Sequence, residues 1–221
     1  MAGAGAPRRP GSCGVVSGSV ARRTQADRRE RTRWSLLVAA ARGLSTYGYS
    51  NLVLEQVAKD AGYTRGALYH LFANKEELAL AVVEWVAETW DAEVRRPSHD
   101  EGDPLAVLLT MARRHAAYCR GHDRARVMLT LRVELTGQDH PVGHAMETTY
   151  DRLEAECADL VRAARRDGSI PAGPPPRLTA RAFLAILESV GIELAGSAPH
   201  DVELVERAVR GVLGVPSPPV D

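Results

Sequence analysis

The sequence is poor in aromatic side chains and in cysteine. Phe, Trp and Tyr make up 5% of the residues, although 45% are hydrophobic, an ordinary share for a globular protein. The cysteines Cys13, Cys119 and Cys157 are odd in number and widely spaced, which argues against a disulfide framework and against a metal knuckle. We infer a reducing compartment. With 221 residues, the chain is long enough for one or two domains with a core.

Long apolar runs are missing as well. No run reaches the roughly 18 apolar residues that a transmembrane helix needs. The N-terminus carries arginines but lacks the apolar segment of a secretory signal, so a cytoplasmic protein is expected. No nucleophile–base pair, metal-ligand set or phosphate loop stands at a persuasive spacing. The sequence therefore predicts no enzyme, no cofactor and no metal.

The formal net charge of zero hides an asymmetry along the chain. Residues 1–75 contain twelve Arg or Lys and four Asp or Glu, a charge of +8, and residues 76–221 carry −8. A basic head on an acidic body is typical of a DNA-binding protein. Part of the basic charge lies in residues 1–24, which have no periodicity and are predicted to be a disordered basic tail. This tail either contacts the DNA backbone or the adjacent minor groove, or is a passive extension.

Two short helical patterns meet in residues 51–75, NLVLEQVAKDAGYTRGALYHLFANK. The first has an apolar face and ends at Gly62, because glycine readily adopts the left-handed conformation that ends helices. The second begins after Thr64, a good N-cap, and runs to about Phe72. It is too short to stand alone in water and must pack on the first. A helix, a glycine turn and a helix form the spacing of a helix-turn-helix.

The outer face of the second helix suits a DNA duplex. Gly66 and Ala67 are small, so the backbone can approach base edges in the major groove. Arg65 stands at the helix start, Tyr69 has the length to reach a phosphate, and Lys75 adds a cation. The alternative is that the two helices are only a packing unit in an all-helical enzyme or small-molecule binding protein.

The run AGYTRGALYHLFANKEEL resembles the DNA-binding signature of the TetR family of transcriptional regulators, and the match covers about Arg28 to Val83. The resemblance implies an all-α protein with an N-terminal three-helix helix-turn-helix domain and a C-terminal helical bundle for ligand binding and dimerisation. Matching positions contact DNA in the family, and Arg28, Ser50 and Gly66 complete the predicted set. The DNA-binding residues are then Arg28, Ser50, Thr64, Arg65, Gly66, Ala67, Tyr69, His70 and Lys75.

Two positions depart from the family pattern. Leu52 and Val53 stand where a threonine pair usually opens the first helix of the motif, so a hydroxyl contact to phosphate is missing. Leu71 stands where a histidine often precedes the phenylalanine. These departures affect which operator sequence the protein recognises. The family implies a ligand-responsive regulator, a homodimeric repressor that a small-molecule effector releases from a palindromic double-stranded DNA operator. Activation instead of repression stays open.

The chain before the motif predicts a helix over residues 25–47, with Trp34 in its core face. Gly48 should end this helix, and Ser50 is available as the next N-cap. After the motif, Asn74 can cap a long helix over residues 75–95, which connects the head with the body. The family resemblance implies that an effector tilts this helix.

Everything beyond Pro104 reads as helices, over about 105–120, 123–135, 141–167, 177–196 and 200–213. We therefore divide the chain into residues 1–24, a helix-turn-helix DNA-binding domain at 25–75, and a ligand-binding and dimerisation domain at 76–221. The last two helices have broad apolar faces, which predict a four-helix interface with a second subunit. The predicted interface residues are Phe183, Leu184, Leu187, Val190, Leu194, Val205, Val209 and Val212.

A ligand cavity is expected among the middle helices, because effector pockets combine apolar walls with a few polar groups. His115 and Cys119 lie one helical turn apart, a spacing that also suits two metal ligands or a redox pair, but two ligands do not make a site. The effector itself cannot be read from the sequence. The predicted pocket residues are Trp85, Met111, His115, Tyr118, Cys119, Met128, Arg132 and Phe183.

Overall fold

The computed structural model describes residues 24–217, and in that range it contains helices and no strand. The all-α prediction is confirmed. Cys13 and residues 1–23 of the predicted tail lie outside the described residues. No described helix has the length and apolarity required to cross a bilayer. The helices are α1 (Gln25–Tyr47), α2 (Leu54–Asp60), α3 (Arg65–Tyr69), α4 (Lys75–Trp90), α5 (Arg96–Ser98), α6 (Pro104–Gly121), α7 (Arg126–Leu135), α8 (Pro141–Asp167), α9 (Pro176–Glu193) and α10 (His200–Leu213).

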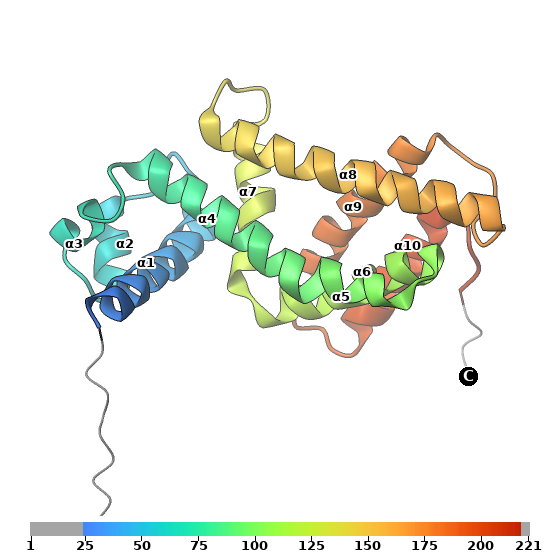
Figure 1. Ribbon diagram of the computed structural model, residues 1–221, viewed down its shortest axis with the longest axis horizontal. Helices are drawn as coiled ribbons and strands as arrows, with labels where there is room; N and C mark the ends of the chain where they lie inside the picture. The colour runs from blue at the N-terminus through green and yellow to red at the C-terminus, as the bar shows by residue number, and fades with distance from the viewer. Residues whose placement is uncertain (1–23, 218–221) are drawn as a thin grey trace, which may run out of the picture.

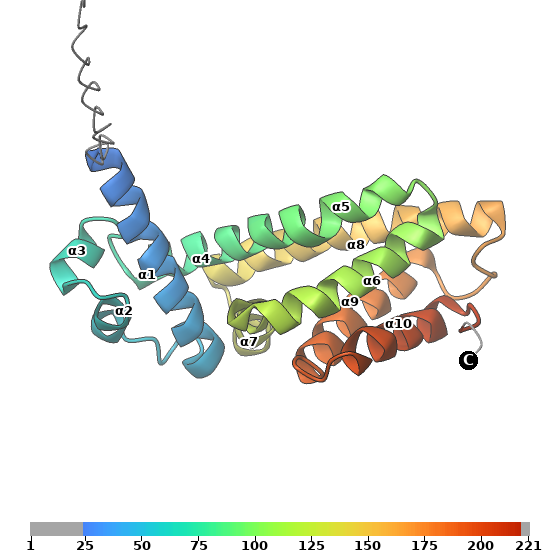
Figure 2. The same ribbon diagram turned by 90° about the horizontal axis from the view of Figure 1, so that it is seen from below.

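The protein has a small head and a larger helical body (Figure 1). Helices α1, α2 and α3 gather at one end, and α4 leaves them and runs into the body alongside α8. In the body, α9 packs against both α8 and α10, and α6 packs against α10 (Figure 2). Helix α7 lies where head and body meet and contacts α1, α4 and α8. It is therefore placed to join the two parts.

Polar caps fix several of the helix starts. The Thr64 side chain accepts a hydrogen bond from the Ala67 amide at 3.2 Å, and that of Asn74 accepts one from the Glu77 amide at 2.8 Å. Both predicted caps are confirmed. The prediction that Ser50 caps the next helix is wrong. The N-cap residue of α2 is Val53, whose side chain makes no capping hydrogen bond.

One helix ends earlier than the sequence predicts, and another changes to a π-helical turn within its predicted bounds. Helix α3 stops at Tyr69, because the Leu71 amide donates to the Leu68 carbonyl at 2.9 Å and the chain tightens into a turn. Helix α4 is regular to Trp90 and continues as a π-helical turn over Asp91–Arg95. Such turns place an extra residue in the helix and commonly mark functional sites. This one lines the cavity described below.

Trp34 is not a core residue. It is 58% exposed, and the prediction that it packs beneath the motif is wrong. No residue of α1 before Leu36 is buried, since the first turns of the helix extend past the elements that cover its second half. Helical spacing placed Trp34 on the same side as Leu37 and Leu44, but at that end of the helix it lines only a groove with Tyr63.

The buried side chains form two clusters. The first joins α1 to α4 with α7 and the start of α8, through residues such as Leu44, Leu78 and Leu131. It continues past Lys75, so the head shares its core with α4 and α7. The division after residue 75 stays a prediction. The second cluster fills the body between α6, α8, α9 and α10.

Five of the eight predicted dimer residues, Leu184 among them, belong to this second cluster. Phe183, Leu187, Val205 and Val209 are at most 1% exposed within the single chain, where they fill the core between α9 and α10. They are not available to a second subunit, and for these four the prediction is wrong. The apolar faces of both helices are broad because they cover their own subunit's core.

Candidate nucleic-acid interface and cavity

The outer face of α3 is free of protein contacts in the described chain. Arg65, Gly66, Tyr69 and His70 are exposed, whereas Leu68 is fully buried against α2 and holds the helix in place. The Arg65 guanidinium lies over the Tyr69 ring, 5.3 Å from its centroid. This stacking keeps a cation and a phenol hydroxyl side by side on one short helix. Both can donate to phosphate oxygens or base edges.

The glycine at position 66 is not explained by the protein's own packing. A Cβ built there would meet only the Thr64 hydroxyl, at 3.8 Å, which is an ordinary contact. Ala67 beside it is partly exposed. Small side chains at two successive positions leave the α3 backbone open to close approach from outside, as a DNA groove requires.

Lys75 and Ser50 lie next to each other in the head. The Lys75 ammonium donates to the Ser50 carbonyl at 3.1 Å and lies 4.7 Å from the centroid of the Tyr49 ring. It is half-buried, so Lys75 fixes the connection between α1 and α2. The Ser50 side chain is exposed near it, and Arg28 is exposed at the first turn of α1.

The head exposes aromatic residues that sequence reasoning did not assign to the surface. Trp34 and Tyr63 line a shallow groove together with Arg31. Tyr47, at the end of α1, is 61% exposed. Trp34 has the spacing of a buried residue, so only the environment of the folded head could reveal its exposure.

One carboxylate joins the body to the head. Glu134 of α7 accepts hydrogen bonds from the amides of Tyr49 at 2.5 Å and Ser50 at 2.8 Å. A Cβ on Gly48 would clash with this carboxylate, and Gly48 has a φ of +75°. Desolvation raises the pKa of Glu134, but hydrogen bonds from Ser50 and Tyr49 and the charge of Lys75 outweigh it and lower the pKa. We call this contact the Glu134 anchor.

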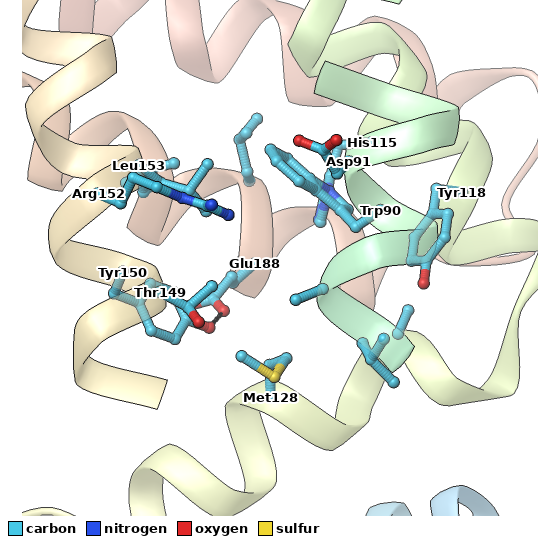
Figure 3. A pocket seen from close by; sticks show the side chains of 15 residues that line it. Trp90, Asp91, His115, Tyr118, Met128, Thr149, Tyr150, Arg152, Leu153 and Glu188 are labelled. Atoms are coloured by element: carbon cyan, nitrogen blue, oxygen red, sulfur yellow. Dashed lines mark hydrogen bonds between the residues drawn. The ribbon is translucent and has the colours of Figure 1, made fainter. Parts of the chain in front are cut away.

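The body contains an apolar cavity of about 70 Å³ between α4, α6, α8 and α9 (Figure 3). Of the predicted pocket residues, His115, Tyr118 and Met128 line it. Met111, Cys119 and Phe183 are buried but do not line it, Trp85 stacks under Arg124 instead, and Arg132 lines a neighbouring groove. Sequence reasoning missed a polar group of wall residues: Asp91, Thr149, Tyr150, Arg152 and Glu188.

His115 is held as a neutral ring at one side of the cavity. The Trp90 indole N–H donates to its Nδ1 at 2.8 Å, and an indole cannot accept, so Nδ1 carries no proton. Burial lowers the pKa of His115 to about 4. Its Nε2 lies 3.2 Å from the Cys119 Sγ. Burial raises the pKa of Cys119, and also that of Cys157, to about 12, so neither thiol is reactive near neutral pH.

Across the cavity from His115 and Trp90, Glu188 projects from α9 toward Tyr150 (Figure 3). The Tyr150 hydroxyl donates to one Glu188 oxygen, and Nη1 of Arg132 donates to the other at 3.0 Å. The Arg132 guanidinium lies 4.6 Å from the Tyr150 ring centroid. Burial raises the pKa of Glu188 to about 7, although Arg132 opposes this. The cavity thus contains one carboxylate that titrates near neutral pH.

Comparison with known proteins places the head in one family. Residues 36–82 match the family model described as bacterial regulatory proteins, tetR family. The chain is 32% identical over 122 residues to the A-factor receptor protein of Streptomyces griseus, covering 54% of this chain and 42% of that one. It is 40% identical over 88 residues to the regulator TtgR of Pseudomonas putida, covering 39% and 41%. The chain thus spans about two fifths of the length of these relatives.

The whole fold has solved counterparts. The crystal structure of AibR, in complex with isovaleryl coenzyme A and operator DNA, superimposes with a TM-score of 0.69. The superposition covers 83% of this chain and 96% of that one at 17% sequence identity, which shows a shared fold and no more.

Proposed function

We propose that the chain is a TetR-family, ligand-responsive transcriptional repressor that binds operator DNA as a cytoplasmic homodimer, because residues 36–82 match the model of that family. The observation that carries this proposal is the exposed face of α3, where Arg65 lies over Tyr69 beside Gly66 and Ala67. A face with a cation, a phenol and two tiny residues fits the major groove better than it fits a protein core. The charge of +8 over residues 1–75 would attract the phosphate backbone.

Binding of this kind depends steeply on salt. In a gel shift with DNA from upstream of its own gene, we expect affinity to fall by about 10³-fold between roughly 50 and 200 mM salt, because each neutralised phosphate releases counterions. Unrelated DNA of the same length should bind weakly with a similar slope. Absence of any band shift at low salt would refute the proposed function.

The proposed dimer uses the outer faces of α9 and α10 rather than their buried faces. On α9 the exposed residues Ala182, Ala185 and Ser189 recur at helical spacing, and on α10 Ala208 and Gly211 continue a surface of small side chains. Two helices with such faces can approach their symmetry mates closely and form a four-helix contact. A two-fold dimer would hold two copies of α3 about 34–36 Å apart, one turn of DNA.

We expect Ala185→Arg to convert the dimer to a monomer, because it buries two like charges near the two-fold axis. Ala155→Arg is the matched control, since Ala155 is exposed on α8 rather than on either of these two helices. Analytical ultracentrifugation distinguishes the two states. A dimer that survives Ala185→Arg would exclude this face, and a monomeric Ala155→Arg variant would place the contact on α8.

Two connections support control of the head by the body. Helix α4 begins at the head and lines the cavity near its end, through Val86 and Trp90. Helix α7 lines the cavity through Met128 and carries the Glu134 anchor farther along. An effector that binds one separation of the two heads better than the other shifts the population by its differential affinity. Both helices would transmit such a shift.

A further inference from the structure

We propose that the effector of this cavity is a small organic cation, an apolar molecule with an amine or quaternary ammonium group that pairs with Glu188 and displaces Arg132. The inference rests on the proposed function and adds the chemical class of the ligand. Three observations support it: the residues that line the cavity, the groups that surround Glu188, and the groove into which the Arg132 side chain can move.

The walls of the cavity leave few polar groups unsatisfied. Asp91 is paired with Arg95 and Arg96, and His115 is neutral and accepts from Trp90. Arg152 also lines the cavity, is exposed, and makes no ion pair in the described part of the chain. The rest of the surface comes mainly from aliphatic and aromatic side chains, which favour an apolar ligand body.

Glu188 is the group that sets the preferred charge. Its side chain is 13% exposed and faces the cavity, with Tyr150 beside it and Trp90 farther away, near His115 (Figure 3). A second carboxylate brought into this dry space would meet like charge, which a low dielectric makes costly. A cation is attracted by the carboxylate and by the faces of the aromatic rings. The carboxylate and the aromatic rings therefore favour positive charge at this end of the cavity, although the Arg152 side chain of α8 also lines it.

Arg132 is the protein's own cation at this carboxylate, and it is able to leave. Its side chain is 42% exposed and borders a groove of about 440 Å³ outside the cavity. Glu147 and Asp151 line the same groove and make no ion pair in the described structure. Tyr150 borders both spaces. A ligand cation at Glu188 thus exchanges one ion pair for another, and the displaced guanidinium remains paired.

Binding of a cation at Glu188 should depend on pH near neutrality. The pKa of Glu188 is raised to about 7 by burial, so the carboxylate ionises around that pH. The other cavity groups keep their charge in this window: the pKa of His115 is about 4 and that of Cys119 about 12. The charged or titratable groups that face Glu188 from the packed elements are Asp91, His115, Cys119, Arg132, Tyr150 and Arg152.

The test uses three probes that are small enough for a cavity of about 70 Å³ and differ in charge: propylamine, propanol and propionate. Isothermal titration calorimetry of the full chain should show the amine binding at least tenfold more tightly than the alcohol, and the carboxylate most weakly. The amine stays protonated throughout, since primary amines titrate near ~10.4. Its affinity should rise by about tenfold from pH 6 to pH 8, as Glu188 ionises, whereas that of the alcohol should not rise.

Glu188→Gln should lower the affinity for the amine at least tenfold and leave the affinity for the alcohol within about twofold. The amide of the variant has the shape of the carboxylate but not its charge. Asp139→Asn is the matched control for removal of a negative charge, since Asp139 is 99% exposed. The proposal would be overturned if the three probes bind equally, if the amine does not bind, or if its affinity does not change with pH. The pH profile needs no variant, so it decides even if Glu188→Gln folds poorly. Gel shifts without probe test the proposed function separately.

Discussion

The double variant Arg65→Ala with Tyr69→Ala should bind operator DNA about 10²- to 10³-fold more weakly, because one base or phosphate contact contributes roughly 1–3 kcal/mol and two are removed. The two side chains lie against each other on the exposed face of α3, and neither fills the core of the head. The melting temperature should therefore change little. The slope of affinity against salt should fall by about one for each phosphate that the variant no longer neutralises. Gel shift and thermal unfolding together measure both effects.

Arg42→Ala is the control for removal of a basic side chain from the head. Arg42 is exposed on α1 but borders a groove shared with Arg120 and His122 of the body, not the face of α3. The affinity of this variant for operator DNA should stay within about threefold of the original, the change expected from one distant charge in salt. Full-strength binding by the double variant would mean that α3 does not lie in the groove, and Trp34 with Tyr63 would become the next surface to test.

Most of the helices could be predicted from the sequence because their signals are local. Helices α8 and α10 have the predicted bounds, since Pro141 opens the first and glycines follow both. The cap at Asn74 depends only on the residues of its own first turn. Local chemistry of this kind is visible in any stretch of chain, whatever the rest of the protein does.

The errors lie where a side chain's surroundings come from distant segments. Trp34 has core spacing, but no element covers its end of α1. Leu187 and Val205 also have core spacing, and the sequence could not distinguish a face turned to the subunit's own core from one turned to a partner. Periodicity identifies an apolar face and leaves open what covers it.

The polar parts of the cavity could not be predicted for a related reason. Glu188 reads as a solvated residue of α9, and only the fold brings Arg132 of α7 and Tyr150 of α8 to it. His115 and Tyr118 could be predicted as wall residues because they are polar groups on the mostly buried helix α6. The contact of Glu134 with the backbone near Ser50 spans 84 positions and leaves no local signal.

The Glu134 anchor leads to the second large effect. Glu134→Gln should destabilise the protein by about 2 kcal/mol at pH 7, because hydrogen bonds to a charged acceptor contribute roughly 1.5–3 kcal/mol. The pKa of Glu134 is lowered in the fold, so its contribution is complete above the unfolded value of about 4.3 and is lost as pH falls through the folded pKa. Urea unfolding should give different stabilities for the two proteins at pH 7 and nearly equal ones in acid.

The same change should weaken control of DNA binding, because Glu134 ties α7 to the loop that Lys75 also holds. Gel shifts with propylamine should show operator affinity near the original without ligand and a ligand response reduced at least tenfold. Gly48→Ala tests the contact from the head side: its Cβ would press on Glu134, whereas Gly102→Ala has a similar positive φ and nothing within 4 Å. Gly48→Ala should therefore cost more stability than Gly102→Ala and reduce the ligand response, and equal effects of the two would exclude the anchor as a coupling contact.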